Sequence, residues 1–220
     1  TMANAEDRRR RGCFLQFAKA PRAGAVKTRL HEQLSPAAAA EVARELTRRV
    51  AAALRGVPAG WDATLCVDDT TDAFLRELAT REGRTLRAQG DGDLGARMWR
   101  AVDAALAEYR AVIVVGSDCL GYDAVYLGDA AAALERGFDA VLGPALDGGY
   151  VLAGFTRLAP AVFAGMSWGT DMVLARQRER FAALGLRWHE LPERADIDRA
   201  QDLWRLGDAA QALAIGRTSP

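Results

Sequence analysis

The chain has 220 residues, of which 50% are hydrophobic and 26% are charged, so it can bury a sizeable core and is not disordered as a whole. Its 29 basic and 29 acidic residues cancel, which argues against a strongly electrostatic binder of duplex DNA. An aromatic content of only 7% argues against a stacking platform for single strands, so no nucleic-acid partner is expected.

Strand patterns recur along the chain after a polar tail, which we place at residues 1–11. Strands are expected at residues 13–18, 63–67, 85–89, 112–115, 140–143, 150–153 and 186–191. The Val-Ile-Val-Val run at 112–115 predicts the most buried strand, because it is short, continuous and β-branched.

Helical patterns lie between these strands. Helices are expected at residues 36–55, 72–82, 94–106, 123–135 and 170–184, and after residue 198. Ser35 and Thr71 are the expected caps of the first two, and Gly56 ends the first. The alternation predicts one α/β domain over residues 12–216, with three α/β/α layers around a mainly parallel central sheet.

The cysteines and the N-terminal segment indicate the cellular compartment in which the protein is expected. Cys13, Cys66 and Cys119 form no C-x-x-C pair and only two histidines occur, so neither a disulfide framework nor a zinc site is expected. Reduced thiols are typical of a cytoplasmic protein. The arginines at 8–11 faintly resemble an export signal, but the apolar run after them is shorter than the roughly 7–15 residues that export requires. No run approaches the roughly 18 apolar residues of a membrane span.

In a sheet of this kind, ligands bind outside the carboxyl ends of the strands. That rule predicts a site built from four loops, at residues 19–29, 90–97, 116–121 and 147–150.

The first of these loops concentrates positive charge. Its cations are Lys19, Arg22, Lys27 and Arg29. Gly24 and Thr28 lie among them, and lysine point charges with arginine forks suit phosphate oxygens. A P-loop is excluded, because Pro21 and Val26 stand where that motif needs glycine. The alternative is an ordinary solvated basic loop. Lys27 and Arg29 are expected to be exposed at the ligand edge of the sheet.

The second loop contains a G-x-G-x-x-G pattern at Gly90, Gly92 and Gly95, which taken literally predicts NAD binding. The preceding strand is polar, Asp91 and Asp93 would repel a pyrophosphate, and the pattern is not in the first strand–helix turn. We therefore do not expect a dehydrogenase.

Three acidic turns offer carboxylates. Asp118 follows the most buried strand, Asp147 begins an Asp-Gly-Gly-Tyr turn, and Asp196 and Asp198 precede the last helix. A carboxylate on such a rigid edge suits a divalent cation, and the glycines let backbone approach a ligand. Helix caps and plain turns are the alternative explanation. Trp168, in a loop between two glycines, is expected to line a pocket.

Together and in this order, these motifs resemble the DUF2064 proteins, also called selenodomain-associated transferase 1 and often labelled glycosyltransferases. The resemblance covers about residues 13–206. It rests on F-A-K-A-P at 17–21, V-K-T-R-L at 26–30, G-D-L-G at 92–95, R-M at 97–98, G-S-D-C at 116–119, D-G-G-Y at 147–150 and D-I-D at 196–198.

The resemblance implies the GT-A fold of the nucleotide-diphospho-sugar transferases, which 2-phospholactate and molybdenum-cofactor guanylyltransferases share. It implies that the first loop binds nucleotide phosphates through Lys27 and Arg29, and that residues 89–95 lie near the base. It also implies Mg²⁺, or Mn²⁺, held by Asp118 with Asp196 or Asp198.

We therefore expect a metal-dependent transferase with a nucleotide donor and an unidentified small-molecule acceptor. Nucleotidyl transfer from an NTP is favoured, because the first loop is basic and no Asp-x-Asp follows the central strand. Glycosyl transfer from an NDP-sugar is the alternative, and a non-catalytic nucleotide-binding protein is a third. No membrane partner is expected, and the oligomeric state is open.

The expected site residues fall into four groups. The catalytic group is Lys27, Arg29 and Asp118. The nucleotide group is Lys19, Gly24, Lys27, Thr28, Arg29, Gln89, Gly92, Leu94 and Gly95. The acceptor group is Asp147, Gly148, Gly149, Tyr150, Trp168 and Thr170. The metal group is Asp118, Asp196 and Asp198.

Overall fold

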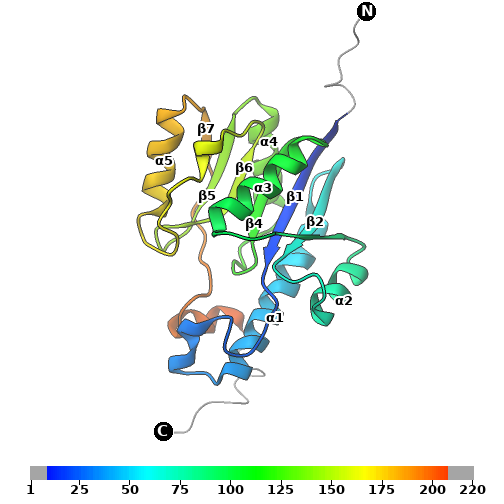
Figure 1. Cartoon of the computed structure of the whole chain (residues 1–220), viewed down its shortest axis with the longest axis vertical. Helices are drawn as coiled ribbons and strands as arrows, with labels where there is room; N and C mark the ends of the chain where they lie inside the picture. Colours follow the sequence, from blue (N-terminus) through cyan, green and yellow to red (C-terminus); the bar gives the residue numbers. More distant parts are fainter. Residues whose placement is uncertain (1–8, 208–220) are drawn as a thin grey trace, which may run out of the picture.

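The computed structural model describes residues 9–207, and Figure 1 shows how its elements are arranged. One seven-stranded sheet has the order β3-β2-β1-β4-β6-β5-β7. The strands are β1 (Arg10–Ala18), β2 (Trp61–Val67), β3 (Thr85–Ala88), β4 (Tyr109–Gly116), β5 (Ala140–Pro144), β6 (Tyr150–Phe155) and β7 (Trp188–Glu190). The α-helices are α1 (Pro36–Ala53), α2 (Ala73–Arg81), α3 (Leu94–Leu106), α4 (Ala124–Glu135) and α5 (Val173–Ala183). The 3₁₀ helices are η2 (Thr28–Glu32), η3 (Leu54–Gly56), η4 (Pro160–Val162) and η5 (Ala200–Leu206).

The sheet is mainly parallel, as predicted. Parallel pairing joins β1 to β2 and β4, β2 to β3, and β5 to β7. The exception is β6, which pairs antiparallel with both β4 and β5. Because β6 runs the other way, it begins at the edge where its neighbours end. The turn at 145–149 therefore lies at the carboxyl edge of the sheet.

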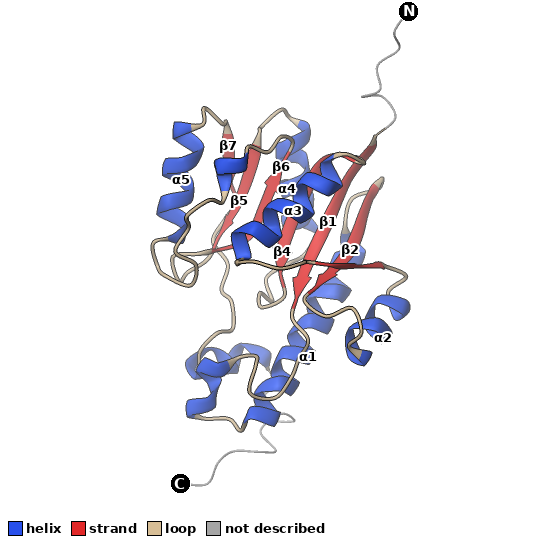
Figure 2. Ribbon diagram, viewed as in Figure 1, coloured by secondary structure: helices blue, strands red, loops and turns tan. Residues whose placement is uncertain are grey.

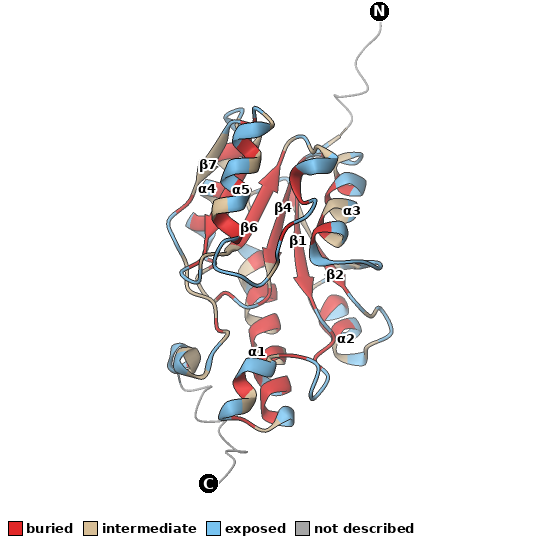
Figure 3. Cartoon of the chain, turned by 60° about the vertical axis from the view of Figure 1, so that its left-hand side comes forward, coloured by how far each residue is buried: buried red, intermediate tan, exposed pale blue. Residues whose placement is uncertain are grey.

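Helices cover both faces of the sheet, which confirms the predicted α/β/α layers (Figure 2). Phe14 of β1 packs in one cluster with residues of α1 and α4. The next residue, Leu15, packs in a second cluster with residues of α3 and α5. Neighbouring side chains of a strand point to opposite faces, so the two clusters lie on opposite sides of the sheet. Figure 3 shows the buried sheet between helices whose outer sides are exposed.

The C-terminal end of the described chain returns to its beginning. η5 lies beside η2 and α1 in Figure 1, where orange-red meets blue. Buried Ile197 and Leu206 pack there against Leu30, Leu34 and residues of α1. This packing brings the segment before η5 to the carboxyl edge of β1 and β4.

Several boundaries differ from those predicted. β1 begins at Arg10, inside the predicted tail, because Arg10 pairs with Tyr109 of β4. Asp72, not Thr71, caps α2 and accepts a hydrogen bond from the Leu75 amide at 3.1 Å. The predicted last helix is the 3₁₀ helix η5, and α5 begins at Val173 rather than at residue 170. Predictions for residues 1–8 and 208–216 lie outside the described residues.

Within residues 9–207, no helix combines the length and the apolar character that crossing a bilayer requires.

Candidate functional site

Three adjoining pockets lie at the carboxyl edge of the sheet. The basic lobe, of about 410 Å³, is lined by four cations, which are Lys19, Lys27, Arg29 and Arg97. The acidic lobe, of about 450 Å³, is lined by aspartates and arginines, namely Asp147, Asp171, Asp196, Asp198, Asp202, Arg29, Arg199 and Arg205. The apolar lobe, of about 200 Å³, is lined mainly by apolar residues, among them Phe17, Leu94, Met98, Val114, Tyr150 and Trp168.

The lobes share walls, so one ligand can extend from one into the next. Arg29 and Asp198 line both the basic and the acidic lobes. Phe17, Leu94 and Gly116 line both the basic and the apolar lobes. Asp147, Gly169 and Thr170 line both the acidic and the apolar lobes.

Lys27 is the central contact of the basic lobe. Its Nζ lies 2.9 Å from Oδ1 of Asp118 and donates to the Ile197 carbonyl at 2.5 Å. Its side chain is only 5% exposed, so our expectation of an exposed lysine was wrong. Lys27 is also the one non-glycine residue with positive φ in the described chain, at 49°. Such strain persists only where surrounding contacts hold it, and three segments meet at this side chain.

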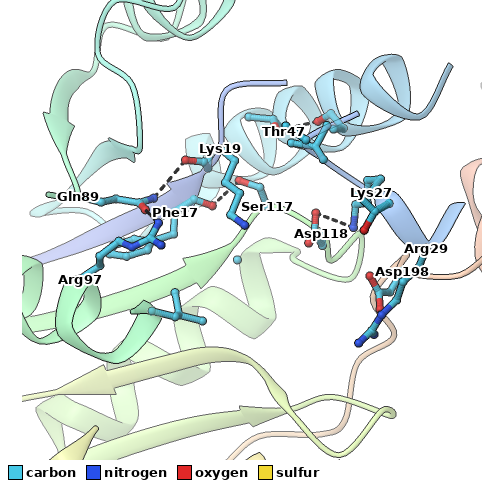
Figure 4. A pocket seen from close by; sticks show the side chains of 17 residues that line it. Phe17, Lys19, Lys27, Arg29, Thr47, Gln89, Arg97, Ser117, Asp118 and Asp198 are labelled. Atoms are coloured by element: carbon cyan, nitrogen blue, oxygen red, sulfur yellow. Dashed lines mark hydrogen bonds and ion pairs between the residues drawn. The ribbon is translucent and has the colours of Figure 1, made fainter. Parts of the chain in front are cut away.

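Arg29 reaches the other side of the same loop and is half exposed, as expected. Its guanidinium forms an ion pair with Asp198 and lies 3.4 Å from the Gly169 carbonyl. Figure 4 shows the Lys27–Asp118 and Arg29–Asp198 pairs at one end of the basic lobe, with Gln89 and Arg97 at the other. Lys19 extends between these ends, and its ammonium has no partner within residues 9–207.

The two acidic segments expected to converge do so through their backbones. Cys119 and Asp196 form an antiparallel bridge, and the Ile197 amide donates to the Asp118 carbonyl at 3.0 Å. The carboxylate that caps η5 belongs to Asp202, which accepts from the Arg199 amide at 2.8 Å. Neither Asp196 nor Asp198 serves as that cap.

Asp196 lies in an environment that disfavours its negative charge. Burial, together with the nearby charges of Asp147 and Asp198, raises the pKa of this carboxyl to about 6, against a lowering by Lys27. A cation between these carboxylates would relieve the repulsion. Within residues 9–207, no three or more His, Cys, Asp or Glu side chains are already grouped as a metal cage. Mg²⁺ needs only one or two protein carboxylates when phosphates and waters complete its shell, so the residues present fit such an ion.

Gln89 holds the strand ends that form the wall of the basic lobe. Its Nε2 donates to the carbonyls of Ala18, at 3.1 Å, and Cys66, at 2.9 Å. Its Oε1 is thereby turned towards Arg97, 3.4 Å away. Gln89 is buried, so these two donors satisfy carbonyls that water does not reach.

Three glycines of the expected nucleotide group do not line the basic lobe. Gly92 has a φ of 98°, and its carbonyl accepts from Arg97 in the turn before α3. Gly95 faces Phe163, whose carbonyl oxygen would lie 2.8 Å from an added Cβ, so it serves helix packing. Gly24 lies in an exposed turn. The others do line the lobe, namely Lys19, Lys27, Thr28, Arg29, Gln89 and Leu94.

The expected acceptor residues gather around the apolar lobe, with one exception. Those lining it are Asp147, Gly149, Tyr150, Trp168 and Thr170. Gly148 lines none of the three lobes, because its backbone packs against Asp171, whose carbonyl oxygen would lie 2.2 Å from an added Cβ. Asp147 also shapes the turn, since its Oδ1 accepts from the Gly149 amide at 2.9 Å.

Sequence reasoning assigned no role to three residues that line the basic lobe, Thr47, Arg97 and Ser117. Arg97 belongs to a motif of the family resemblance, which was the available signal. Ser117 precedes Asp118 and donates to the Phe17 carbonyl at 2.8 Å, tying β4 to β1. Thr47 lies within α1, and no local pattern marks it.

The family model described as "Uncharacterized protein conserved in bacteria (DUF2064)" matches residues 51–170. The chain belongs to the DUF2064 family. The matched part of this DUF2064 chain contains Gln89, Asp118 and the residues that shape the apolar lobe through Thr170.

Solved structures match the DUF2064 chain over nearly its whole length. A candidate nucleotide-diphospho-sugar transferase from Desulfovibrio desulfuricans is 29% identical, with a TM-score of 0.79, and the match covers 92% of this chain and 93% of that one. A Leptospira borgpetersenii cytidylyltransferase is 12% identical (TM-score 0.61, coverage 94% and 90%). The glucosyl-3-phosphoglycerate synthase of Mycobacterium tuberculosis, solved with Mg²⁺ and UDP, is 13% identical (TM-score 0.55, coverage 93% and 76%).

These likenesses show that the DUF2064 chain has the fold of the nucleotide-diphospho-sugar transferases, as expected. At 12–13% identity, the last two show the fold alone. A comparison with curated protein sequences gave no match.

Proposed function

We propose that this DUF2064 chain is a metal-dependent transferase that moves a nucleotidyl group from an NTP to a small phosphorylated or hydroxyl acceptor. The observation that carries the proposal is the basic lobe, in which four cations line one pocket at the ligand edge of the sheet. The wall opposite Gln89 and Arg97 carries Asp118 and Asp198.

The cations of the basic lobe differ in how free they are to meet phosphate. Lys27 is already neutralised by Asp118, so its role is to position that carboxylate and the segment at Ile197. Lys19 has no partner within residues 9–207, and Arg97 contacts only uncharged groups there, the Gln89 side chain and the Gly92 carbonyl. Lys19 and Arg97, together with half-exposed Arg29, are therefore the groups that would bind the phosphates and stabilise the departing pyrophosphate.

The carboxylates at the other end suit a divalent cation. Asp118, Asp196 and Asp198 would hold Mg²⁺ or Mn²⁺. Two observations support this choice: the backbone bridge between Cys119 and Asp196, and the burial of Asp196 near the charges of Asp147 and Asp198, which raises its pKa. Bound there, the ion would neutralise phosphate charge beside the acceptor.

In the proposed reaction an oxygen of the acceptor attacks the α-phosphorus of the NTP. A new oxygen–phosphorus bond forms, and the bond to the bridging oxygen of the β-phosphate breaks, so pyrophosphate leaves with the electron pair of that bond. A hydroxyl acceptor releases its proton to water, whereas a phosphate acceptor attacks through an oxygen that carries none. The acceptor would lie among the residues that join the acidic and apolar lobes, Asp147, Gly149, Tyr150, Trp168 and Thr170.

Glycosyl transfer from an NDP-sugar is the second candidate. The observation that favours it is the 29% identical structure, which is described as a candidate nucleotide-diphospho-sugar transferase. The same cations would then stabilise a departing nucleoside diphosphate.

Product analysis separates the two reactions. A thermal-shift screen of NTPs and NDP-sugars with Mg²⁺ first identifies the donor, because a ligand at about 100 times its dissociation constant stabilises a fold by roughly 2.7 kcal/mol. The selected donor is then incubated with phosphate-bearing and hydroxyl-bearing acceptors. Release of pyrophosphate supports the proposal, and release of an NDP supports glycosyl transfer. Binding without turnover across the panel would favour a non-catalytic nucleotide-binding protein.

A further inference from the structure

The apolar lobe differs in chemistry from its two neighbours. Aromatic rings of Phe17, Tyr150 and Trp168 line it together with aliphatic side chains such as Met98 and Val114. Among the described residues that line it, Asp147 is the only charged one. A site at the ligand edge of the sheet therefore has one compartment built for apolar groups.

The hydroxyl groups in this lobe are already engaged. Tyr150 donates its hydroxyl to Oε1 of Gln177 at 3.3 Å, and Gln177 in turn donates to the Val162 carbonyl at 3.1 Å. Thr170 donates to the Ser167 carbonyl at 2.9 Å. A polar ligand body would lose hydrogen bonds to water here and find few replacements.

The walls of the lobe are preformed. Trp168 meets the Tyr150 ring edge to face, with centroids 6.3 Å apart, and also contacts Phe163 at 6.3 Å. Gly95 gives room for this packing, because an added Cβ would lie 3.0 Å from the Trp168 ring. The lobe thus offers a fixed shape rather than a surface that a ligand must order.

The position of the lobe ties it to the proposed reaction. Leu94, a large apolar side chain that is 40% exposed, forms part of the wall between the apolar and basic lobes. On another side, Asp147 and Thr170 border the acidic lobe. A molecule seated in the apolar lobe would cover Leu94 and have one end beside the carboxylates.

We infer that the acceptor is amphiphilic: an aliphatic or aromatic body fills the apolar lobe, and a phosphate or hydroxyl group extends to its border with the acidic lobe. This inference rests on the proposed function and narrows its acceptor class. Burial of apolar surface is the driving force, so affinity depends on the size of the body.

A homologous series of n-alkyl phosphates tests the inference directly. Ethyl, butyl and hexyl phosphate are titrated by calorimetry into the full chain, with and without the selected NTP and Mg²⁺. Affinity should rise about fourfold for each methylene until the lobe is filled. Hexyl phosphate should bind more tightly than glucose 1-phosphate, which carries the same head group on a polar body. A flat series, or tighter binding of glucose 1-phosphate, would overturn the inference.

Two variants that nearly preserve side-chain shape test whether the alkyl group binds in the apolar lobe. Val114→Thr and Val173→Thr each place a hydroxyl in the lobe and should reduce the gain in affinity per methylene, whereas Val125→Thr, 72% exposed on α4, should leave it unchanged. An equal effect of all three would contradict the assignment. If one of the two lobe variants does not fold, the other variant and the unaltered chain still test whether the alkyl group lies in the apolar lobe.

NTP binding is measured on the same samples. A chain that binds NTP but shows a flat series refutes only this inference, and absence of NTP binding refutes the proposed function.

Discussion

Nζ of Lys27 lies 2.9 Å from Oδ1 of Asp118, so two groups that were expected to bind phosphate and metal separately neutralise each other. The lysine is nearly buried and its φ is 49°. Lys27 therefore contributes to the assembly of the site as well as to its charge, and stability measurements can separate the two contributions.

Lys27→Ala should lower the free energy of unfolding by about 1–2 kcal/mol, because the ion pair and the bond to Ile197 are lost. That corresponds to a fall in melting temperature of roughly 2–8 °C. Arg29→Ala is the matched control, since its half-exposed ion pair should contribute no more than about 0.5 kcal/mol. Thermal unfolding measures both. Equal melting temperatures in the two variants would contradict the anchoring role of Lys27.

Mg²⁺ and nucleotide should bind cooperatively. In the unaltered chain, EDTA should weaken NTP binding by at least about tenfold, because a cation shared between carboxylates and phosphates is removed. Asp118→Asn should fold and bind NTP with little dependence on Mg²⁺. Asp103→Asn removes an exposed carboxylate of α3 outside the lobes and should keep the full dependence. Calorimetric titration checks all three, and a Mg²⁺ effect that survives Asp118→Asn would exclude Asp118 as a ligand.

The three thiols should be inert in the native chain. Cys13, Cys66 and Cys119 are free and buried, and burial raises their pKa values to about 11, 12 and 11. The thiolate is the reactive form, so little of it exists at pH 8. A colorimetric disulfide reagent should label none of them at that pH in the folded chain and all of them in guanidinium chloride. Rapid labelling of the folded chain would show that a thiol is accessible.

Gln89→Leu should destabilise the fold even though it introduces an apolar residue at a buried position. The carbonyls of Ala18 and Cys66 would lose their amide donors, at a cost of about 1–3 kcal/mol. Gln33→Leu, at an exposed position, should change stability by less than about 0.5 kcal/mol. Urea unfolding with an unchanged m-value measures the difference. Similar midpoints for both variants would mean that Gln89 does not hold the strand ends.

Gly148→Ala should destabilise the turn between β5 and β6 more than a positive φ alone explains. Gly148 has a φ of 87°, and an added Cβ would lie 2.2 Å from the Asp171 carbonyl oxygen. Gly165 has a φ of 62° with open space around it, so Gly165→Ala isolates the backbone strain. The Gly148 variant should melt several degrees lower than the Gly165 variant. If the Gly165 variant melts as low, strain rather than the clash dominates.

The sheet and its ligand edge could be predicted because their signals are local. A continuous β-branched run such as 112–115 predicts a buried strand, and the order of strands and helices then places Asp118 at the carboxyl edge. The choice of Asp72 over Thr71 as a cap could not be predicted, because both residue types cap helices and they are adjacent. Arg10 was assigned to the polar tail because its strand structure depends on pairing with Tyr109, which is distant in sequence.

In the candidate site, too, features marked by sequence motifs could be predicted and features set only by distant contacts could not. The family resemblance implied that Asp118 would meet the segment at 196–198, and the backbone bridge lies there. The burial of Lys27 could not be predicted, since it depends on a carbonyl 170 positions away. Nor could Gly95 be distinguished from a phosphate-binding glycine, because its close neighbour is the backbone of Phe163, brought there only by the fold.

The same long-range contact bears on how the protein is made. Lys27 is synthesised 170 positions before Ile197, which at about 5–20 residues per second corresponds to roughly ten to thirty seconds of translation. A chain made as far as Glu190 already contains every strand of the described sheet, since β7 ends there. It still lacks the carbonyl that holds Lys27 and the carboxylates of Asp196 and Asp198. A chain that ended just after β7 would thus contain every strand of the described sheet and the cations of the basic lobe, but the carboxylate end of the site would be incomplete.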